Sequence, residues 1–216
     1  KGLALTYGQK HSDAISCFDK AIKINPEFYD AYYQKGLALT YGQKHSDAIS
    51  CFDAALAINP KFYDAYYHRG LAFCIMRKHD EALLNFDIIL KNDPNNLDAY
   101  YQKGLVMSIL GKHSDAISCF DKAIKINPEF YDAYYQKGLA LTYGQKHSDA
   151  ISCFDAALAI NPYDASVLYQ KGLALTYGQK HSDAITCFDA ALAINPYDAG
   201  VLYQKGLALT YGQKHS

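Results

Sequence analysis

The amino-acid sequence repeats itself at a constant period, and this period constrains the fold more than any other feature. The phrase KGLALTYGQKHS, or a diverged copy of it, starts at positions 1, 35, 69, 103, 137, 171 and 205, so every step is equal. A fixed period of roughly 20–50 residues is the signature of repeat architectures, in which each unit buries its apolar surface against the next. We therefore expect one stacked array, although a chain of 216 residues would ordinarily form one or two domains.

Each repeat has the pattern of two helices joined by a short turn. In the copy that starts at Tyr29, apolar residues recur at helical spacing until Gly42 and Gln43 interrupt them. Ser46 is the expected N-cap of a second amphipathic helix. Pro60 ends that helix, because proline lacks an N–H donor and disfavours helix at the residue before it. The sequence thus predicts an all-α chain of antiparallel helix hairpins.

These repeats resemble the tetratricopeptide repeat (TPR) family. With Tyr29 as repeat position 1, the family pattern has an aromatic residue at 4, glycine at 8, alanine at 20, an aromatic residue at 24, alanine at 27 and proline at 32. The matching residues are Tyr32, Gly36, Ala48, Phe52, Ala55 and Pro60. Two departures stand out: position 7 is lysine or arginine where the family usually has leucine, and position 14 is glycine in most repeats.

The resemblance covers the whole chain and implies a right-handed superhelical solenoid. Full repeats are predicted at 29–62, 63–96, 97–130, 131–164 and 165–198, with partial repeats at 1–28 and 199–216. Small residues at positions 8 and 20 are expected where the two helices of a hairpin approach most closely. The large aromatic residue at position 24 is expected to fill the space toward the next repeat.

Composition argues against several classes of partner. The net charge is −1 and no block of like charges occurs, so we expect no nucleic-acid partner. No apolar run is long enough for a membrane span, and no membrane partner is expected. Six cysteines without a CxxC motif indicate unpaired thiols, which favours a reducing, cytoplasmic location.

No constellation in the sequence predicts catalysis, so we expect a protein that is not an enzyme and that needs no metal or cofactor. His45, Ser46 and Asp47 are the residue types of a hydrolase triad, but contiguous residues cannot converge as a triad requires. Histidines one repeat apart cannot share a metal ion. His68 stands where Gln34 and its other equivalents are glutamine. It either tunes a local contact or reflects sequence drift, and drift is the interpretation we favour.

Three acid–base pairs on the second helices have an i,i+4 spacing. This spacing predicts surface ion pairs within each helix. The pairs are Asp19–Lys23, Asp87–Lys91 and Asp121–Lys125.

In the TPR family the first helices line the concave surface through positions 2, 5, 9, 12 and 13. Here these positions carry tyrosine, leucine and aspartate, and their spacing keeps them on one side of a helix. The candidate peptide-binding residues are Tyr33, Leu37, Tyr41, Asp64, Tyr67, Leu71, Asp98, Tyr101, Leu105, Tyr135, Leu139, Tyr143, Tyr169, Leu173 and Tyr177. The family's Lys, Asn and Arg clamp for a C-terminal carboxylate is absent from the equivalent positions.

Two functions remain open on these grounds. The first is a non-catalytic scaffold that binds a peptide or protein segment on the concave face, where tyrosine provides a large, rigid contact area. The alternative is a structural or self-associating spacer or filament, natural or engineered, without a dedicated ligand. Under that alternative, uncovered apolar residues such as Leu202 and Leu209 would pair end to end with another copy.

Overall fold

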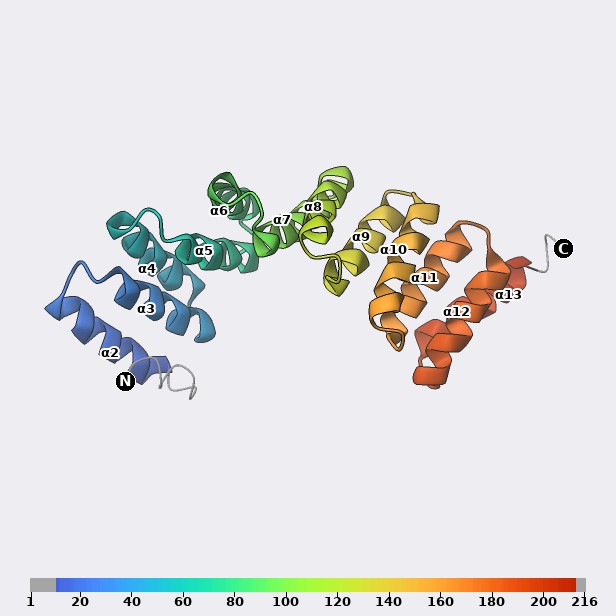
Figure 1. Cartoon of the computed structure of the whole chain (residues 1–216). Helices are drawn as coiled ribbons and strands as arrows, with labels where there is room; N and C mark the ends of the chain where they lie inside the picture. Colours follow the sequence, from blue (N-terminus) through green and yellow to red (C-terminus); the bar gives the residue numbers. More distant parts are fainter. Residues whose placement is uncertain (1–10, 213–216) are drawn as a thin grey trace. The chain divides into compact units, whose positions relative to one another are not determined.

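A computed structural model of the chain describes residues 11–212, and all regular structure in this range is helical. Helices of 13 residues alternate with helices of 14 up to Ile194, as expected for repeated hairpins (Figure 1). The helices are α2 (His11–Ile24), α3 (Tyr29–Tyr41), α4 (His45–Ile58), α5 (Tyr63–Ile75), α6 (His79–Asn92), α7 (Leu97–Ile109), α8 (His113–Ile126), α9 (Tyr131–Tyr143), α10 (His147–Ile160), α11 (Ala165–Tyr177), α12 (His181–Ile194) and α13 (Ala199–Gly212).

The turn between the two helices of a hairpin depends on a residue in the left-handed backbone region. Gly42, at the end of α3, has a φ of −80°, whereas Gln43 has a φ of 60°. The Lys44 N–H donates to the Leu39 carbonyl at 2.8 Å and the Gln43 N–H to the Thr40 carbonyl at 3.0 Å. This pair of bonds is a Schellman motif, which ends the first helix and reverses the chain. Arg77, Gly111, Gln145 and Gln179 occupy the same place in later repeats.

The predicted N-cap at Ser46 is wrong. Because the turn is so tight, α4 already begins at His45, and the preceding residue, Lys44, makes no side-chain cap bond. Ser46 lies inside the first turn, where its carbonyl accepts a hydrogen bond from the Ser50 hydroxyl at 3.3 Å. The other end of the helix is as predicted: α4 ends at Ile58, and Asn59 before the proline is extended.

The core of each hairpin forms where a glycine lets a phenylalanine ring approach a backbone. A Cβ added at Gly36 would lie 2.5 Å from the Phe52 ring, so only glycine fits here. Phe52 and Ala48 are both fully buried, and Ala65 of the next repeat joins the same cluster. The phenylalanine therefore fills space within its own hairpin and toward the following one, as the spacing predicts.

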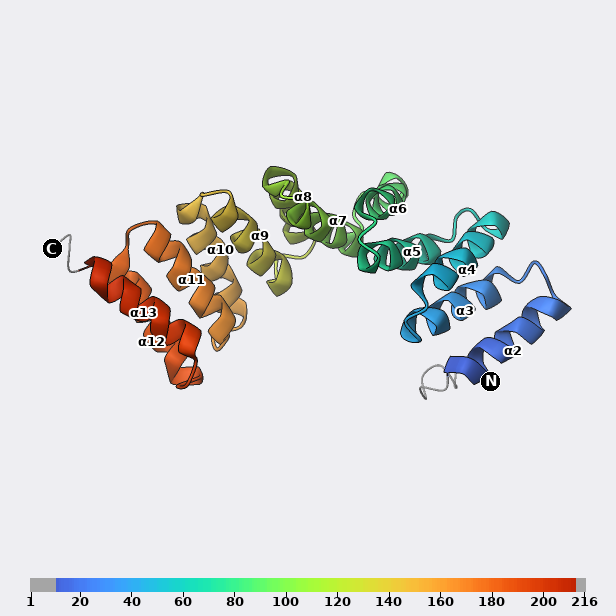
Figure 2. The ribbon, with the colours of Figure 1, turned by 180° about the vertical axis from the view of Figure 1, so that it is seen from behind.

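The chain divides into two compact units, residues 1–106 and residues 107–216, with the boundary inside α7. In the first unit, helices from α2 to α6 pack against their neighbours along the chain. In the second unit, helices from α8 to α13 do the same. The two views of Figures 1 and 2 show this neighbour-to-neighbour order within each unit. First helices of successive repeats also meet, α3 with α5 in one unit and α9 with α11 in the other.

Over residues 11–212, none of the helices combines the length and the apolar character that crossing a membrane requires.

Candidate peptide-binding face

The candidate residues lie at equivalent places on successive first helices, and we call them the first-helix face. In the first unit the face comprises Tyr33, Leu37, Tyr41, Asp64, Tyr67, Leu71, Asp98, Tyr101 and Leu105; in the second it comprises Tyr135, Leu139, Tyr143, Tyr169, Leu173 and Tyr177. The five leucines are half-buried, and the tyrosines range from buried to exposed. Each unit thus offers its own apolar and aromatic surface.

The tyrosines at position 5 use part of their ring area to hold the hairpin together. Tyr67 lies 6.2 Å from Phe86 and Tyr135 lies 6.3 Å from Phe154, measured between ring centroids. Tilted ring pairs of this kind add stability beyond the area that they bury. Both tyrosines nevertheless remain half-buried, so each also presents ring surface to solvent.

The tyrosines at position 13 are the most exposed part of the face. Tyr41, Tyr143 and Tyr177 are 60%, 71% and 58% exposed. Each ring lies against the histidine at the start of the preceding second helix: Tyr143 stacks on His113 with centroids 5.8 Å apart and planes at 20°. The histidine holds one side of the ring and leaves the remainder free to contact a ligand.

The histidine–tyrosine contact was not predicted, although the sequence contains a signal for it. His11 and Tyr41 stack with centroids 5.9 Å apart. The same separation along the sequence recurs where the rings meet in later repeats. These pairs are His113–Tyr143, His147–Tyr177 and His181–Tyr211. The Nδ1 atoms of these histidines are buried and make no hydrogen bond within the described part of the chain.

Aspartates form one edge of the first-helix face. Asp64 and Asp98 are exposed in the first turns of α5 and α7, and Asp30 and Asp132 take the same place in α3 and α9. A carboxylate in this position stabilises the positive end of the helix dipole. None of these four takes part in an ion pair with another described residue.

The prediction of ion pairs within the second helices is wrong, because the aspartates pair with lysines of the following repeat. Asp19 pairs with Lys35 at 2.6 Å and Asp121 with Lys137 at 2.6 Å, each across the contact between two repeats. The hydrogen bond to Asp19 raises the pKa of Lys35, although burial acts in the opposite direction. The sequence contains a signal for these ion pairs between repeats. From Lys35 onward, each basic residue at position 7 is preceded by an aspartate at position 25 of the previous repeat.

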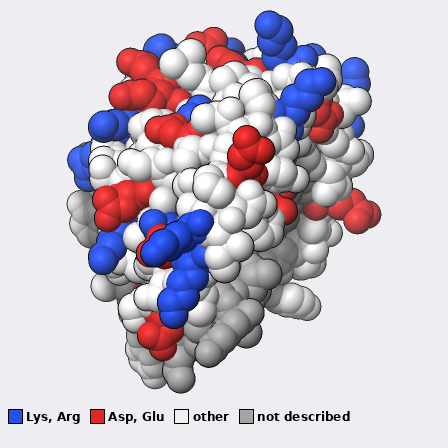
Figure 3. Space-filling model, turned by 90° about the vertical axis from the view of Figure 1, so that its left-hand side faces the viewer, with Lys and Arg blue, Asp and Glu red and all other residues white. Residues whose placement is uncertain are grey.

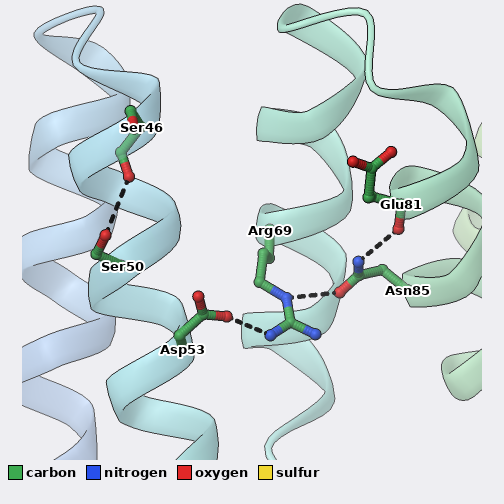
Figure 4. A network of polar contacts seen from close by, with 6 residues as sticks. All are labelled: Ser46, Ser50, Asp53, Arg69, Glu81 and Asn85. Carbon is green, nitrogen blue, oxygen red and sulfur yellow. Dashed lines mark hydrogen bonds and ion pairs between the residues drawn. The ribbon is translucent and has the colours of Figure 1, made fainter.

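Arg69 extends this ion pair into a small network (Figure 4). Its guanidinium pairs with Asp53 of α4, and its Nε donates to the Asn85 Oδ1 at 2.8 Å. Asn85 in turn donates to the Glu81 carbonyl at 2.7 Å, which satisfies the amide in the core. Three consecutive helices are joined by these bonds, on residues that no other repeat carries in this combination.

His68 occupies an aromatic cluster on the first-helix face. Its ring centroid lies 5.7 Å from that of Tyr33, 6.4 Å from that of Phe52 and 5.4 Å from that of Tyr67. Burial lowers the pKa of the imidazole below its usual value of 6.5, and the charge of Asp64 only partly opposes this shift. His68 therefore makes specific ring contacts, whether or not the substitution arose by drift.

Charge and ligand geometry give no sign of another kind of site. On the surface that Figure 3 draws, basic and acidic side chains are interspersed. No group of three or more His, Cys, Asp and Glu side chains within residues 11–212 is arranged to hold a metal ion. None of the six cysteines, which all lie within residues 11–212, forms a disulfide. Leu202 and Leu209 are 51% and 44% exposed, and the self-association expected from them stays a prediction.

Comparison with solved structures relates the chain to known repeat proteins. YrrB, described as a TPR protein with an unusual peptide-binding site, is 26% identical over 88% of this chain and 97% of its own, with a TM-score of 0.76. MamA is 25% identical over 74% of this chain and 94% of its own, with a TM-score of 0.71. The C-terminal part of a TPR repeat-containing protein from Cytophaga hutchinsonii, at 17% identity and a TM-score of 0.83 over 97% of this chain and 84% of its own, supports the fold alone.

Family models agree with this relationship. Models of the tetratricopeptide repeat match residues 97–130, 131–164 and 165–198, and a TPR repeat model matches residues 2–40 and 36–74. Comparison with curated protein sequences gave no match. With matched segments over most of its length and paired helices throughout residues 11–212, the chain belongs to the tetratricopeptide repeat family.

Proposed function

We propose that this non-catalytic scaffold binds a peptide segment on its first-helix face. The observation that carries the proposal is the exposure of aromatic rings on the first helices next to half-buried leucines. Tyr41 is 60% exposed, Tyr143 71% and Tyr177 58%. Exposed apolar surface that is contiguous, as a tyrosine and a leucine one helical turn apart can provide, is typical of interaction sites. The peptide-binding site named for YrrB supports the same type of activity.

The contacts around the exposed tyrosine rings suit non-covalent binding of a peptide. Tyr143 and Tyr177 are held on one side by His113 and His147, with ring centroids 5.8 Å apart in both pairs. A ring that is already ordered loses little conformational entropy when a ligand covers its free side. The neighbouring half-buried Leu139 and Leu173 extend the apolar surface along each helix. Affinity would come from several such contacts, one set from each repeat.

The experiment needs a ligand, which we would obtain by selecting a displayed peptide library on the immobilised chain. The selected peptide is then titrated by fluorescence anisotropy against Tyr143→Ala and Tyr177→Ala. Truncating an aromatic anchor at an interface should weaken binding by about 10-fold or more. These two tyrosines are preferable to Tyr67 and Tyr135, whose rings also stabilise the hairpin core.

Tyr163→Ala and Tyr197→Ala are the matched controls. Tyr163 and Tyr197 are 82% and 93% exposed but lie in the loops before α11 and α13, outside the first-helix face. Both controls should leave the affinity unchanged. Equal affinity for all four variants would place the selected peptide elsewhere and contradict the proposal.

A further inference from the structure

Tyr33 differs from the equivalent tyrosines of the first-helix face because it is covered. It is 9% exposed and counts among the core residues, whereas Tyr67, Tyr135 and Tyr169 are half-buried. Among the rings that lie against it are Phe62, with its centroid 4.7 Å away, His68, 5.7 Å away, and Phe52, 5.9 Å away. Tyr33, the first of these tyrosines along the described chain, is therefore largely shielded from solvent.

The residue at repeat position 6 of the following repeat lies beside some of these tyrosines. Burial raises the pKa of Tyr67 and of Tyr169, and the side chains of Gln102 and Gln204 partly oppose this rise. Each glutamine comes from the first helix of the following repeat. His68 takes this place beside Tyr33, and histidine occurs at position 6 in this repeat alone. An aromatic ring thus stands beside Tyr33, where a glutamine side chain stands beside Tyr67.

Burial in this cluster favours the neutral form of the imidazole over the charged form. Tyr33 from α3, Phe52 from α4 and Tyr67 from α5 surround the ring, so its charged form would lose hydration. Among the charged groups of the described helices packed around it, the Asp64 carboxylate is the one that acts on His68. Asp53 of α4 is engaged by Arg69. The exposed Asp64 carboxylate, one turn earlier on α5, is therefore the described charge that a protonated His68 would face.

We propose that His68 gates the first-helix face: the neutral ring covers Tyr33, and protonation removes that cover and adds Tyr33 to the surface that a peptide meets. The gate regulates the peptide-binding face proposed above and rests on that function for its biological meaning. The gating itself concerns the exposure of one tyrosine, and it can be measured without any peptide. Failure of the gate and failure of peptide binding are therefore separate results.

The test follows Tyr33 by ¹⁹F NMR in protein labelled with 3-fluorotyrosine. The Tyr33 resonance is the one that disappears in Tyr33→Phe. Its exposure is measured as broadening by a neutral gadolinium chelate, between about pH 8 and about pH 5, the range in which histidine changes charge. Tyr33 should be protected at the upper end of this range, and its broadening should rise toward that of Tyr67 as the pH falls.

Two variants make the test specific. His68→Gln restores the residue of the other repeats. It should leave Tyr33 more accessible than in the wild-type protein at neutral pH and remove the pH dependence, although the Phe62 ring stays against Tyr33. The reciprocal change, Gln102→His, should protect Tyr67 at neutral pH and release it in acid. Circular dichroism at each pH establishes that the helices remain folded.

Three results would overturn the gate. The first is a Tyr33 that stays protected in acid while the helices remain folded. The second is a His68→Gln variant with the protection of the wild type. The third is loss of helical signal over the same pH range, because exposure of Tyr33 would then follow from unfolding.

Discussion

Gly36 and Phe52 meet so closely that the backbone of one helix lies directly on the ring of the next. A Cβ at Gly36 would lie 2.5 Å from this ring, and the ring itself has no exposed surface. Gly138 and Phe154 repeat the contact with the same distance. Glycine weakens the helix that contains it. In these hairpins it also allows the close contact between backbone and ring.

Gly138→Ala should destabilise the second unit. The added methyl group overpacks the Phe154 ring, which has no exposed surface into which to move, and overpacking of this kind costs roughly 1–3 kcal/mol. Gly206→Ala is the control, because a Cβ there meets no atom within 4 Å. That change should raise stability by up to about 1 kcal/mol through helix propensity. Urea unfolding followed by circular dichroism measures both, and equal effects would refute the packing argument.

Gln145→Gly should stabilise the second unit by about 0.5–1 kcal/mol, because glycine adopts positive φ without the cost that other residues incur. Gln145 has a φ of 60° in the turn after α9. The reverse change, Gly111→Ala, should destabilise by a similar amount. Steric crowding does not explain this expected loss of stability, because a Cβ at Gly111 would meet nothing within 4 Å. If both variants shift the urea midpoint in the same direction, the backbone argument is wrong.

The pair of Asp155 and Lys171 should contribute modestly to the contact between repeats. Its atoms are 2.6 Å apart, with side chains 54% and 22% exposed. Burial opposes the charge of Lys171, yet the hydrogen bond to Asp155 leaves its pKa raised. A double-mutant cycle with Asp155→Asn and Lys171→Gln should give a coupling energy of about 0.2–1 kcal/mol, as for other exposed pairs. High salt should reduce it, and a coupling that is insensitive to salt would contradict this assignment.

Asp164 should make stability depend on pH in the acid range. Its Oδ1 accepts from the Ser166 and Val167 N–H groups at 2.8 Å and 3.1 Å, and its Oδ2 accepts from the Tyr131 hydroxyl at 2.5 Å. Burial opposes ionisation, but these hydrogen bonds hold the pKa of Asp164 below its ordinary value of 3.8. The stabilisation is therefore complete above pH 3.8 and is lost as the pH falls through the lower folded value.

Asp164→Ala should cost about 0.5–2 kcal/mol at neutral pH, as expected for a lost N-cap. Asp164→Asn keeps an acceptor at the cap and removes the titration, so its stability should follow the pH less steeply than that of the wild type. Urea midpoints for the three proteins between neutral and acid pH make the comparison. If the urea midpoint of the wild type changes with pH as steeply as that of Asp164→Asn, Asp164 is not the source of the pH dependence.

The repeat period predicted the helices well because each hairpin contains its own start, turn and stop. Gly36, Phe52 and Pro60 each act through a contact or a constraint that depends on residue type alone. The prediction of an N-cap at Ser46 failed because Gln43, with its left-handed backbone, shortens the turn, so that the helix begins at His45. A serine next to a turn is a common cap, and the sequence does not show how tight the turn is.

Contacts between repeats were harder to predict than contacts within them. Asp19 pairs with Lys35 of the next repeat and not with Lys23 on its own helix, because position 7 of one repeat lies against position 25 of the repeat before it. At the level of sequence, His68 is one substitution among near-identical repeats. The placement of Tyr33, Phe52 and Tyr67 around its ring depends on the packing of three helices, which the sequence does not show.

The contacts that join repeats have a consequence for how such a gene can change length. Asp121 and Lys137 belong to adjacent repeats, as do His113 and Tyr143, so these links reach no further than the neighbouring unit. Unequal recombination that adds or removes one whole repeat would restore the same links at the new junction. A shift by any other length would leave aspartate without lysine and histidine without tyrosine. The spacing of these partners therefore selects, among all insertions and deletions, those that preserve the register of the repeat.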